Sequence, residues 1–106
     1  MERHVKYRRL GETDLNVSEL GFGVWSVATG WWGKIDKPEA IRLLKDAQEL
    51  GVNFFDTADT YGEGYGEEIL RETFGKGRSE LIIGTKFGYD IYAPREGHHK
   101  ERPQRW

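Results

Sequence analysis

The stretch VNFFDTADTYG, residues 52–62, decides the fold and carries the clearest sign of a site. Its first four residues, 52–55, are mostly β-branched or aromatic and lie between glycines, a pattern typical of a buried strand. Asp56 then falls at the carboxyl end of this strand, the edge where parallel α/β proteins build active sites, and Tyr61 follows in the departing loop. Asp56 and Tyr61 are therefore either a candidate active site or a turn cap beside a half-buried loop aromatic.

Length and composition favour a globular protein without a general affinity for nucleic acid or membranes. The chain has 106 residues, of which 37% are hydrophobic, enough for a packed core. Sixteen basic and eighteen acidic residues leave a net charge of only -2, so no global field attracts nucleic acid or an anionic membrane. The absence of cysteine excludes disulfides and thiolate chemistry and fits a reducing compartment. No apolar run reaches signal-peptide or bilayer-spanning length, so we expect a soluble, cytoplasmic protein.

Hydrophobic periodicity on both sides of the central stretch predicts strands that alternate with helices. The predicted elements are a hairpin at 5–10 and 15–20, strands at 20–25, 52–55 and 81–86, and helices at 36–50 and 67–74. Asp36 is the expected helix N-cap, because Glu39 follows three residues later and Pro38 lies in the first turn. Strands joined through helices build a parallel sheet by right-handed crossovers, so the fold class is α/β.

Trp31 and Trp32 lie in a predicted loop at residues 26–35. Such large apolar side chains either close over the neighbouring core or wall a ligand pocket. Of these two interpretations we favour the core.

Two other patterns are weaker than they first look. The glycines at 62–66 follow a strand and precede a helix, as in a dinucleotide fingerprint, but Glu67 occupies the third glycine position and would repel a pyrophosphate. His98 and His99 are adjacent and have no acidic or cysteine partner at ligand spacing. We therefore expect neither a Rossmann site nor a metal site.

Asp56, Tyr61 and Lys86 follow the ends of two neighbouring predicted strands. In a parallel sheet or barrel these ends lie side by side, so a carboxylate, a phenol and an ammonium can converge. The trio suits proton donation by Tyr61, because an ammonium at contact distance favours the phenolate that donation leaves behind. Asp56 would hold Lys86 in place and keep it protonated, although its negative charge partly offsets this help.

With these residues in view, the sequence resembles the aldo-keto reductase superfamily. The resemblance is carried by GFGVW at 21–25, NFFDTADTYGEG at 53–64 with the following EEILRE, and IIGTKFG at 82–88. It covers most of residues 5–92. The form DTADTYG is closer to the bacterial and plant-type branches, whose relatives include the potassium-channel β-subunits, than to the vertebrate hydroxysteroid enzymes.

The resemblance implies a (β/α)8 TIM barrel, closed at its bottom by the amino-terminal hairpin, that reduces aldehydes or ketones with NADPH. The family has a catalytic tetrad of Asp, Tyr, Lys and His, and its first three members match Asp56, Tyr61 and Lys86. Tyr61 would protonate the carbonyl oxygen of a small-molecule substrate while the nicotinamide delivers hydride.

The resemblance also implies where the cofactor would lie. Gly23, Val24 and Trp25 match the family segment that lies against the cofactor and the substrate pocket. Asp56 also touches the nicotinamide ribose in relatives. The loops that grip the adenosine phosphates belong to later strands of the barrel, so these residues alone do not choose between NADPH and NADH.

The family's histidine lies at the end of the fourth barrel strand, and His98 and His99 come too early to replace it. A complete barrel needs roughly 250 residues. We therefore expect residues 1–106 to be a single incomplete domain, the amino-terminal hairpin and about three β/α units of the barrel. The isolated fragment should be inactive, because its sheet edges are left unpaired. The alternative is a barrel that binds nicotinamide without catalysis and acts as a sensor or partner subunit.

Overall fold

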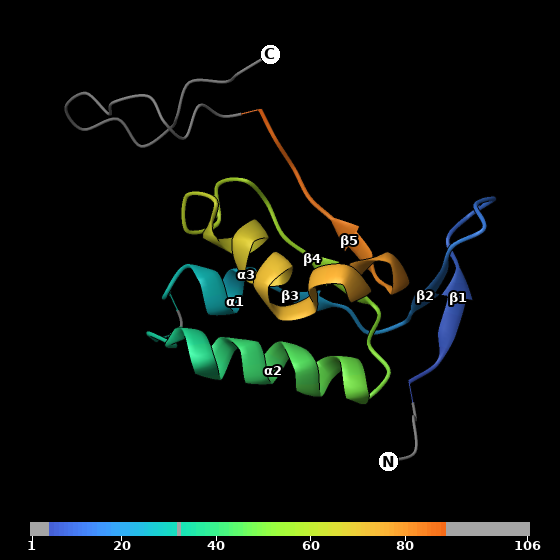
Figure 1. The fold of residues 1–106 in the computed structure, drawn as a ribbon. Coiled ribbons are helices and arrows are strands. Elements are labelled where there is room, and N and C mark those ends of the chain that lie inside the picture. The colour runs from blue at the N-terminus through green and yellow to red at the C-terminus, as the bar shows by residue number, and fades with distance from the viewer. Residues whose placement is uncertain (1–4, 32, 89–106) are drawn as a thin grey trace.

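The computed structural model describes residues 5–31 and 33–88 (Figure 1). In chain order the elements are β1 Tyr7–Arg9, β2 Asn16–Ser18, β3 Phe22–Gly23, α1 Trp25–Ala28, α2 Lys37–Glu49, β4 Phe54–Asp56, α3 Tyr65–Phe74, the 3-10 helix η1 Gly75–Glu80 and β5 Ile82–Gly84. The predicted alternation of strands and helices is confirmed, and with it the α/β class.

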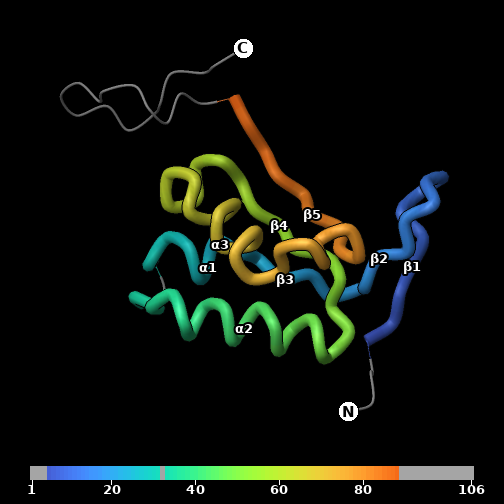
Figure 2. Tube along the Cα trace, viewed as in Figure 1, coloured from blue at the N-terminus to red at the C-terminus, as the bar shows by residue number. Residues whose placement is uncertain are grey.

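Two separate sheets form. The first is the expected hairpin, in which β1 and β2 pair antiparallel, and it extends from the end of the fold away from α1 (Figure 2). The second is a parallel sheet of order β3-β4-β5. Its register aligns Phe22 with Phe55 and Phe55 with Ile83, so the three carboxyl ends lie at one edge. This edge receives the loops that carry the candidate site.

The core lies between the parallel sheet and the helices. Its centre is Phe55, which is fully buried and contacts Phe22 and Phe74 at ring-centroid distances of 5.9 and 5.0 Å. The buried hydrophobic residues around it are Val24, Val27, Ala40, Leu44, Ile69 and Leu70. Because alternate residues of a strand face opposite sides, burying Phe55 against the helices directs its neighbour Asp56 to the other face.

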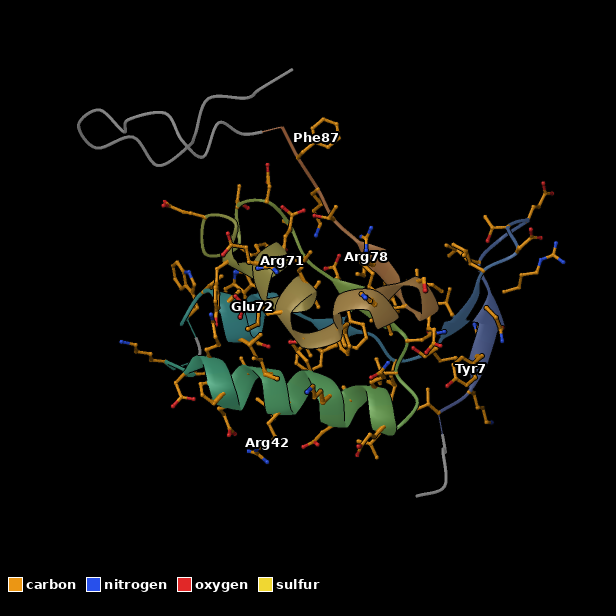
Figure 3. All side chains as sticks on the ribbon, viewed as in Figure 1. Tyr7, Arg42, Arg71, Glu72, Arg78 and Phe87 are labelled. Carbon is orange, nitrogen blue, oxygen red and sulfur yellow. The ribbon has the colours of Figure 1, made fainter. Side chains whose placement is uncertain are left out.

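Helix α2 forms as the sequence predicts. The side chain of Asp36 accepts a hydrogen bond of 3.0 Å from the Glu39 backbone N–H, which satisfies one of the free donors of the first turn. Ala40 and Leu44 face the core. Arg42 points away from it (Figure 3) and pairs with Glu39 in the exposed turn.

The predicted strand 20–25 is wrong in its second half. The strand ends at Gly23, Val24 adopts a helical conformation, and Trp25–Ala28 form the one-turn helix α1. Side-chain oxygens favour this turn, since Ser26 Oγ donates to Gly23 O and Thr29 Oγ1 donates to Trp25 O. A helix this short carries no periodicity, so the sequence pattern does not reveal it.

Other boundaries shift by one or two residues. Strand β4 begins at Phe54 instead of residue 52, helix α3 begins at Tyr65 instead of residue 67, and β5 ends at Gly84 instead of residue 86. After α3 the chain continues directly into the 3-10 helix Gly75–Glu80. Helix and strand ends are set by local hydrogen bonds, which residue patterns specify poorly.

The core interpretation of Trp31 is wrong. Its side chain is 76% exposed and stacks on Trp25, with ring centroids 6.2 Å apart. Gly30, in a left-handed conformation with φ of +76°, turns the chain after α1. Trp32 lies outside the described residues.

Asn53 ties the hairpin to the start of β4. Its Oδ1 accepts from the Ser18 backbone N–H at 2.8 Å, its Nδ2 donates to Asn16 O at 2.8 Å, and its backbone N–H donates to Ser18 Oγ at 3.1 Å. The hairpin and the parallel sheet share no strand pairing, so this side chain is a major link between them.

Asn53→Ala is expected to lower the free energy of unfolding by about 1–3 kcal/mol, because the Ser18 N–H loses its acceptor in a partly buried place. Urea denaturation measures this loss. Asn16→Ala is the matched control, since Asn16 contributes its backbone carbonyl, which the substitution keeps. Equal midpoints for the two variants would contradict this role of Asn53.

Candidate active site

Parallel pairing of β4 and β5 brings the predicted site residues together. Asp56 is the last residue of β4 and lies opposite Gly84, the last residue of β5. Pairing continues beyond both strands, since Thr57 N–H donates to Gly84 O at 2.8 Å and Asp59 N–H donates to Lys86 O at 3.0 Å. Lys86 therefore arrives beside the loop that carries Tyr61.

The ammonium of Lys86 is the centre of the cluster. Its Nζ donates to Thr57 O at 2.8 Å, to Asp56 Oδ1 at 3.1 Å and, at the longer distance of 3.5 Å, to the Tyr61 hydroxyl. Nζ also lies 5.1 Å from the centre of the Tyr61 ring. An ammonium has three N–H donors, so these three oxygens match its full donor set.

The cluster stabilises the charged form of Lys86. Partial burial lowers the pKa of Lys86, but hydrogen bonds to Asp56 and Tyr61 and the charges of both groups outweigh it, so the pKa lies above the usual 10.5. The side chains of Lys86 and Asp56 are 55% and 46% exposed. Ion pairs this exposed contribute little to folding stability, so the fold does not depend on this pair.

The Thr57 carbonyl is a member of the cluster that the sequence does not reveal. It is the nearest acceptor of the Lys86 ammonium, at 2.8 Å. Thr57 is completely buried, so this carbonyl has a fixed position. Every residue has a backbone carbonyl, and only the tertiary structure shows which one faces the ammonium.

The segment predicted to contact a cofactor lies directly beside Asp56. Gly23 is paired with Asp56 in the sheet, and Val24 N–H donates to Asp56 O at 2.9 Å. The side chain of Val24 is buried in the core, which leaves its backbone as the part that could meet a ligand. A side chain added at Gly23 would meet no atom of the described residues within 4 Å, so among them there is free space next to Asp56. Trp25 begins α1.

Within residues 5–31 and 33–88, no helix has the length and apolar character needed to cross a bilayer. No three or more acidic or histidine side chains of these residues gather as metal ligands would. His98 and His99 lie outside the described residues.

Fold and site define an α/β chain with a Lys-Tyr-Asp cluster at the carboxyl edge of a parallel sheet. The sequence model of the Aldo/keto reductase family matches residues 19–105. The chain belongs to the aldo/keto reductase family, which confirms the resemblance seen in its motifs.

The curated relatives are much longer than this chain. YqkF of Bacillus subtilis (strain 168), described as an uncharacterized oxidoreductase, is 39% identical over 84 residues, which are 79% of this chain and 26% of that protein. A protein of Arabidopsis thaliana described as "Probable voltage-gated potassium channel subunit beta" is 40% identical over 95 residues, 87% of this chain and 28% of that protein. The chain thus spans little more than a quarter of either relative.

A solved structure shows the same relation. The holo form of the aldo-keto reductase AKR11C1 from Bacillus halodurans matches with a TM-score of 0.75 at 36% identity, covering 95% of this chain and 30% of that one. The described fold therefore corresponds to part of the TIM barrel of these aldo-keto reductases.

Proposed function

We propose that this chain is the amino-terminal part of an NADPH-dependent reductase of aldehydes or ketones. The observation that carries the proposal is the contact of the Lys86 ammonium with both Asp56 and the Tyr61 hydroxyl. Membership of the aldo/keto reductase family supports the reaction type. A cytoplasmic location, which the absence of cysteine favours, is part of the same proposal.

The direction of the Lys86–Tyr61 contact gives Tyr61 its role. A protonated lysine can only donate, so the phenol oxygen accepts from Nζ and its own proton stays available for a substrate. Tyr61 gives this proton to the carbonyl oxygen, and the ammonium stabilises the phenolate that remains. Asp56 and the Thr57 carbonyl hold the ammonium in place.

The residues beside Asp56 fit a nicotinamide. Free space at Gly23 and the exposed carboxylate of Asp56 leave room for a ring and a ribose hydroxyl at the edge of the sheet. When bound, the nicotinamide would supply hydride to the carbonyl carbon, so that hydride and the Tyr61 proton together give the alcohol. Preference for NADPH over NADH is the finer part of the proposal.

We further propose that the active protein is a complete barrel of which this chain forms the beginning. Several large apolar side chains lie exposed in this chain, among them Leu20 at 64% and Phe87 at 82%, and Phe87 projects away from the fold in Figure 3. Further strands and helices would cover such side chains and supply the family's histidine. Such a complete barrel is either the longer gene product or a chimera in which residues 5–88 replace the matching segment of the Bacillus halodurans reductase.

The complete barrel is expected to oxidise NADPH in the presence of an aldehyde panel, whereas the isolated chain is not. Within the described residues, the outer edge of β5 has no strand partner. The proposed reaction also needs the family's histidine, which belongs to a fourth barrel strand. Absorbance at the nicotinamide band measures turnover, and the same assay with NADH measures cofactor preference. Steady turnover by the pure isolated chain would contradict the proposal that activity needs the complete barrel. Absence of turnover in both complete barrels would contradict the proposed reductase function.

A second candidate function has support from one comparison. The Arabidopsis thaliana relative is described as a potassium-channel β-subunit, so a nicotinamide-binding barrel that serves as a sensor or partner subunit is an alternative. The intact Lys86–Tyr61 contact favours catalysis. A complete barrel that binds NADPH tightly without turning over any aldehyde or ketone would favour the partner subunit.

A further inference from the structure

We propose that Gly62 is a positioning residue, which seats the Tyr61 loop against the carboxyl end of α1 and so sets the distance from the Tyr61 hydroxyl to Lys86. The catalytic consequence rests on the proposed function, because it requires Tyr61 to act as the acid. The contact itself is a property of the fold and can be tested without turnover.

Gly62 packs too closely on α1 to carry a side chain. A Cβ at this position would lie 2.6 Å from the carbonyl oxygen of Ala28 and 2.8 Å from Cβ of Tyr65. Both distances are far below a normal contact, and the first neighbour is a backbone atom that no rotamer change can remove. Gly62 also has a φ of +63°, a conformation that costs other residues roughly 1–2 kcal/mol.

Helix α1 is held in place by the core and by strand β4. Val24 and Val27 are buried in the core, at 0% and 4% exposure. The Val24 backbone N–H donates to Asp56 O at 2.9 Å, which joins the start of α1 to strand β4. A side chain at residue 62 would therefore displace the loop and leave α1 where it is.

The loop would pass this displacement to Tyr61. Residues 62–64 all have left-handed backbones, with φ of +63°, +56° and +101°; glycine adopts this conformation readily at 62 and 64, whereas Glu63 does so at a cost. Gly66 N–H holds the Tyr61 carbonyl at 2.9 Å, and Tyr65 N–H donates to Gly62 O at 3.3 Å. Tyr61 therefore lies in a short, hydrogen-bonded turn, and a displacement of residue 62 would move Tyr61 as well.

The Tyr61–Lys86 contact is sensitive to small shifts. At 3.5 Å, the distance from the hydroxyl to Nζ is at the upper limit of a hydrogen bond. Asp56 and the Thr57 carbonyl hold Lys86 independently of the Tyr61 loop. If Tyr61 were displaced, Lys86 would stay in place and the distance between them would increase. The close packing of Gly62 on α1 is therefore needed for the Tyr61 hydroxyl to contact the Lys86 ammonium.

Gly62→Ala in the complete barrel is expected to lower kcat about 10- to 100-fold, because a misplacement of the donor by an ångström costs this much. The dissociation constant for NADPH should stay within about twofold, since the substitution does not touch the Gly23–Asp56 pair. Two glycines provide controls for backbone strain alone. Gly64, in the same loop, and Gly11, in the hairpin, have φ of +101° and +54°, and a Cβ at either would meet no atom within 4 Å in the part of the chain that the structure describes.

Gly64→Ala and Gly11→Ala should reduce stability while kcat stays within about threefold of the wild type. An equal loss of kcat in Gly62→Ala and Gly64→Ala would overturn the proposal, because strain would then explain both. Unchanged kcat in Gly62→Ala would also overturn it.

A variant on the other side of the contact keeps the test decisive if Gly62→Ala does not fold. Val27→Ala removes methyl groups from the core side of α1, so that α1 supports the Gly62 contact less firmly and kcat should fall severalfold. Leu44→Val, a change in the same core under α2, should leave kcat unchanged. Equal kcat values for the two core variants would overturn the proposal.

A titration separates failure of this inference from failure of the proposed function. Nitrogen NMR of the Lys86 ammonium in the complete barrel reports its pKa without any substrate. In Gly62→Ala the pKa of Lys86 should fall from its raised value, because the hydrogen bond and charge of Tyr61 that raise it are lost. In Gly64→Ala it should not change. If the wild type lacks turnover, the reductase proposal fails, while this titration still decides whether Gly62 seats Tyr61.

Discussion

Tyr61→Phe in the complete barrel is expected to lower kcat for aldehyde reduction by about 10²–10⁴-fold, the usual contribution of a positioned general acid. Phenylalanine keeps the ring but removes the phenolic proton that Tyr61 would give to a carbonyl oxygen. Lys86 should stay in place, because Asp56 and the Thr57 carbonyl still accept from it at 3.1 and 2.8 Å. Steady-state turnover measures the loss, and fluorescence titration with NADPH should show unchanged binding.

Tyr7→Phe is the matched control for removal of a tyrosine hydroxyl. The Tyr7 hydroxyl donates to Gly51 O, at the far end of α2 from the site. Its loss should cost about 0.5–1.5 kcal/mol of stability and leave kcat unchanged. Near-normal turnover by Tyr61→Phe would remove Tyr61 from the role of acid, whatever the control does.

Lys86→Met is expected to lower kcat by about 10²–10³-fold, because the phenolate formed by proton transfer loses the cation that stabilises it. The effect on pH dependence has a definite sign. The pKa of Lys86 is raised above 10.5, so the ammonium is present at neutral pH and is lost only as the pH rises beyond that value. The wild type should therefore lose activity in this alkaline range through Lys86, and the variant should show no such step.

Lys37→Met controls for loss of a lysine charge. Lys37 joins α2 to α3 through an exposed pair with Glu72 at 2.9 Å, remote from the cluster. Exposed pairs contribute little to stability, so this variant should fold and turn over normally. A Lys86→Met enzyme with the kcat and pH profile of Lys37→Met would show that the ammonium has no part in catalysis.

The sequence was sufficient for the elements whose residue pattern repeats. The apolar run at 52–55 and the helical spacing after Asp36 predicted β4 and α2, because burial of one face repeats with the period of the element. It was insufficient for α1 and for Trp31. One helical turn is too short to show a period in the sequence. Residue type alone does not distinguish a tryptophan buried in the core from an exposed one that stacks on another tryptophan.

By itself, the sequence determined the α/β class and the family and singled out Asp56, Tyr61 and Lys86 as candidates, because side-chain chemistry and the approximate positions of strands can be read from residue order. Only the tertiary structure decided that the Thr57 carbonyl is the nearest acceptor of Lys86 and that Gly62 rests on α1. Both are contacts of backbone atoms. Every residue carries the same backbone, so residue types do not show which backbone atoms meet; pairing of β4 with β5 and packing of α1 decide that.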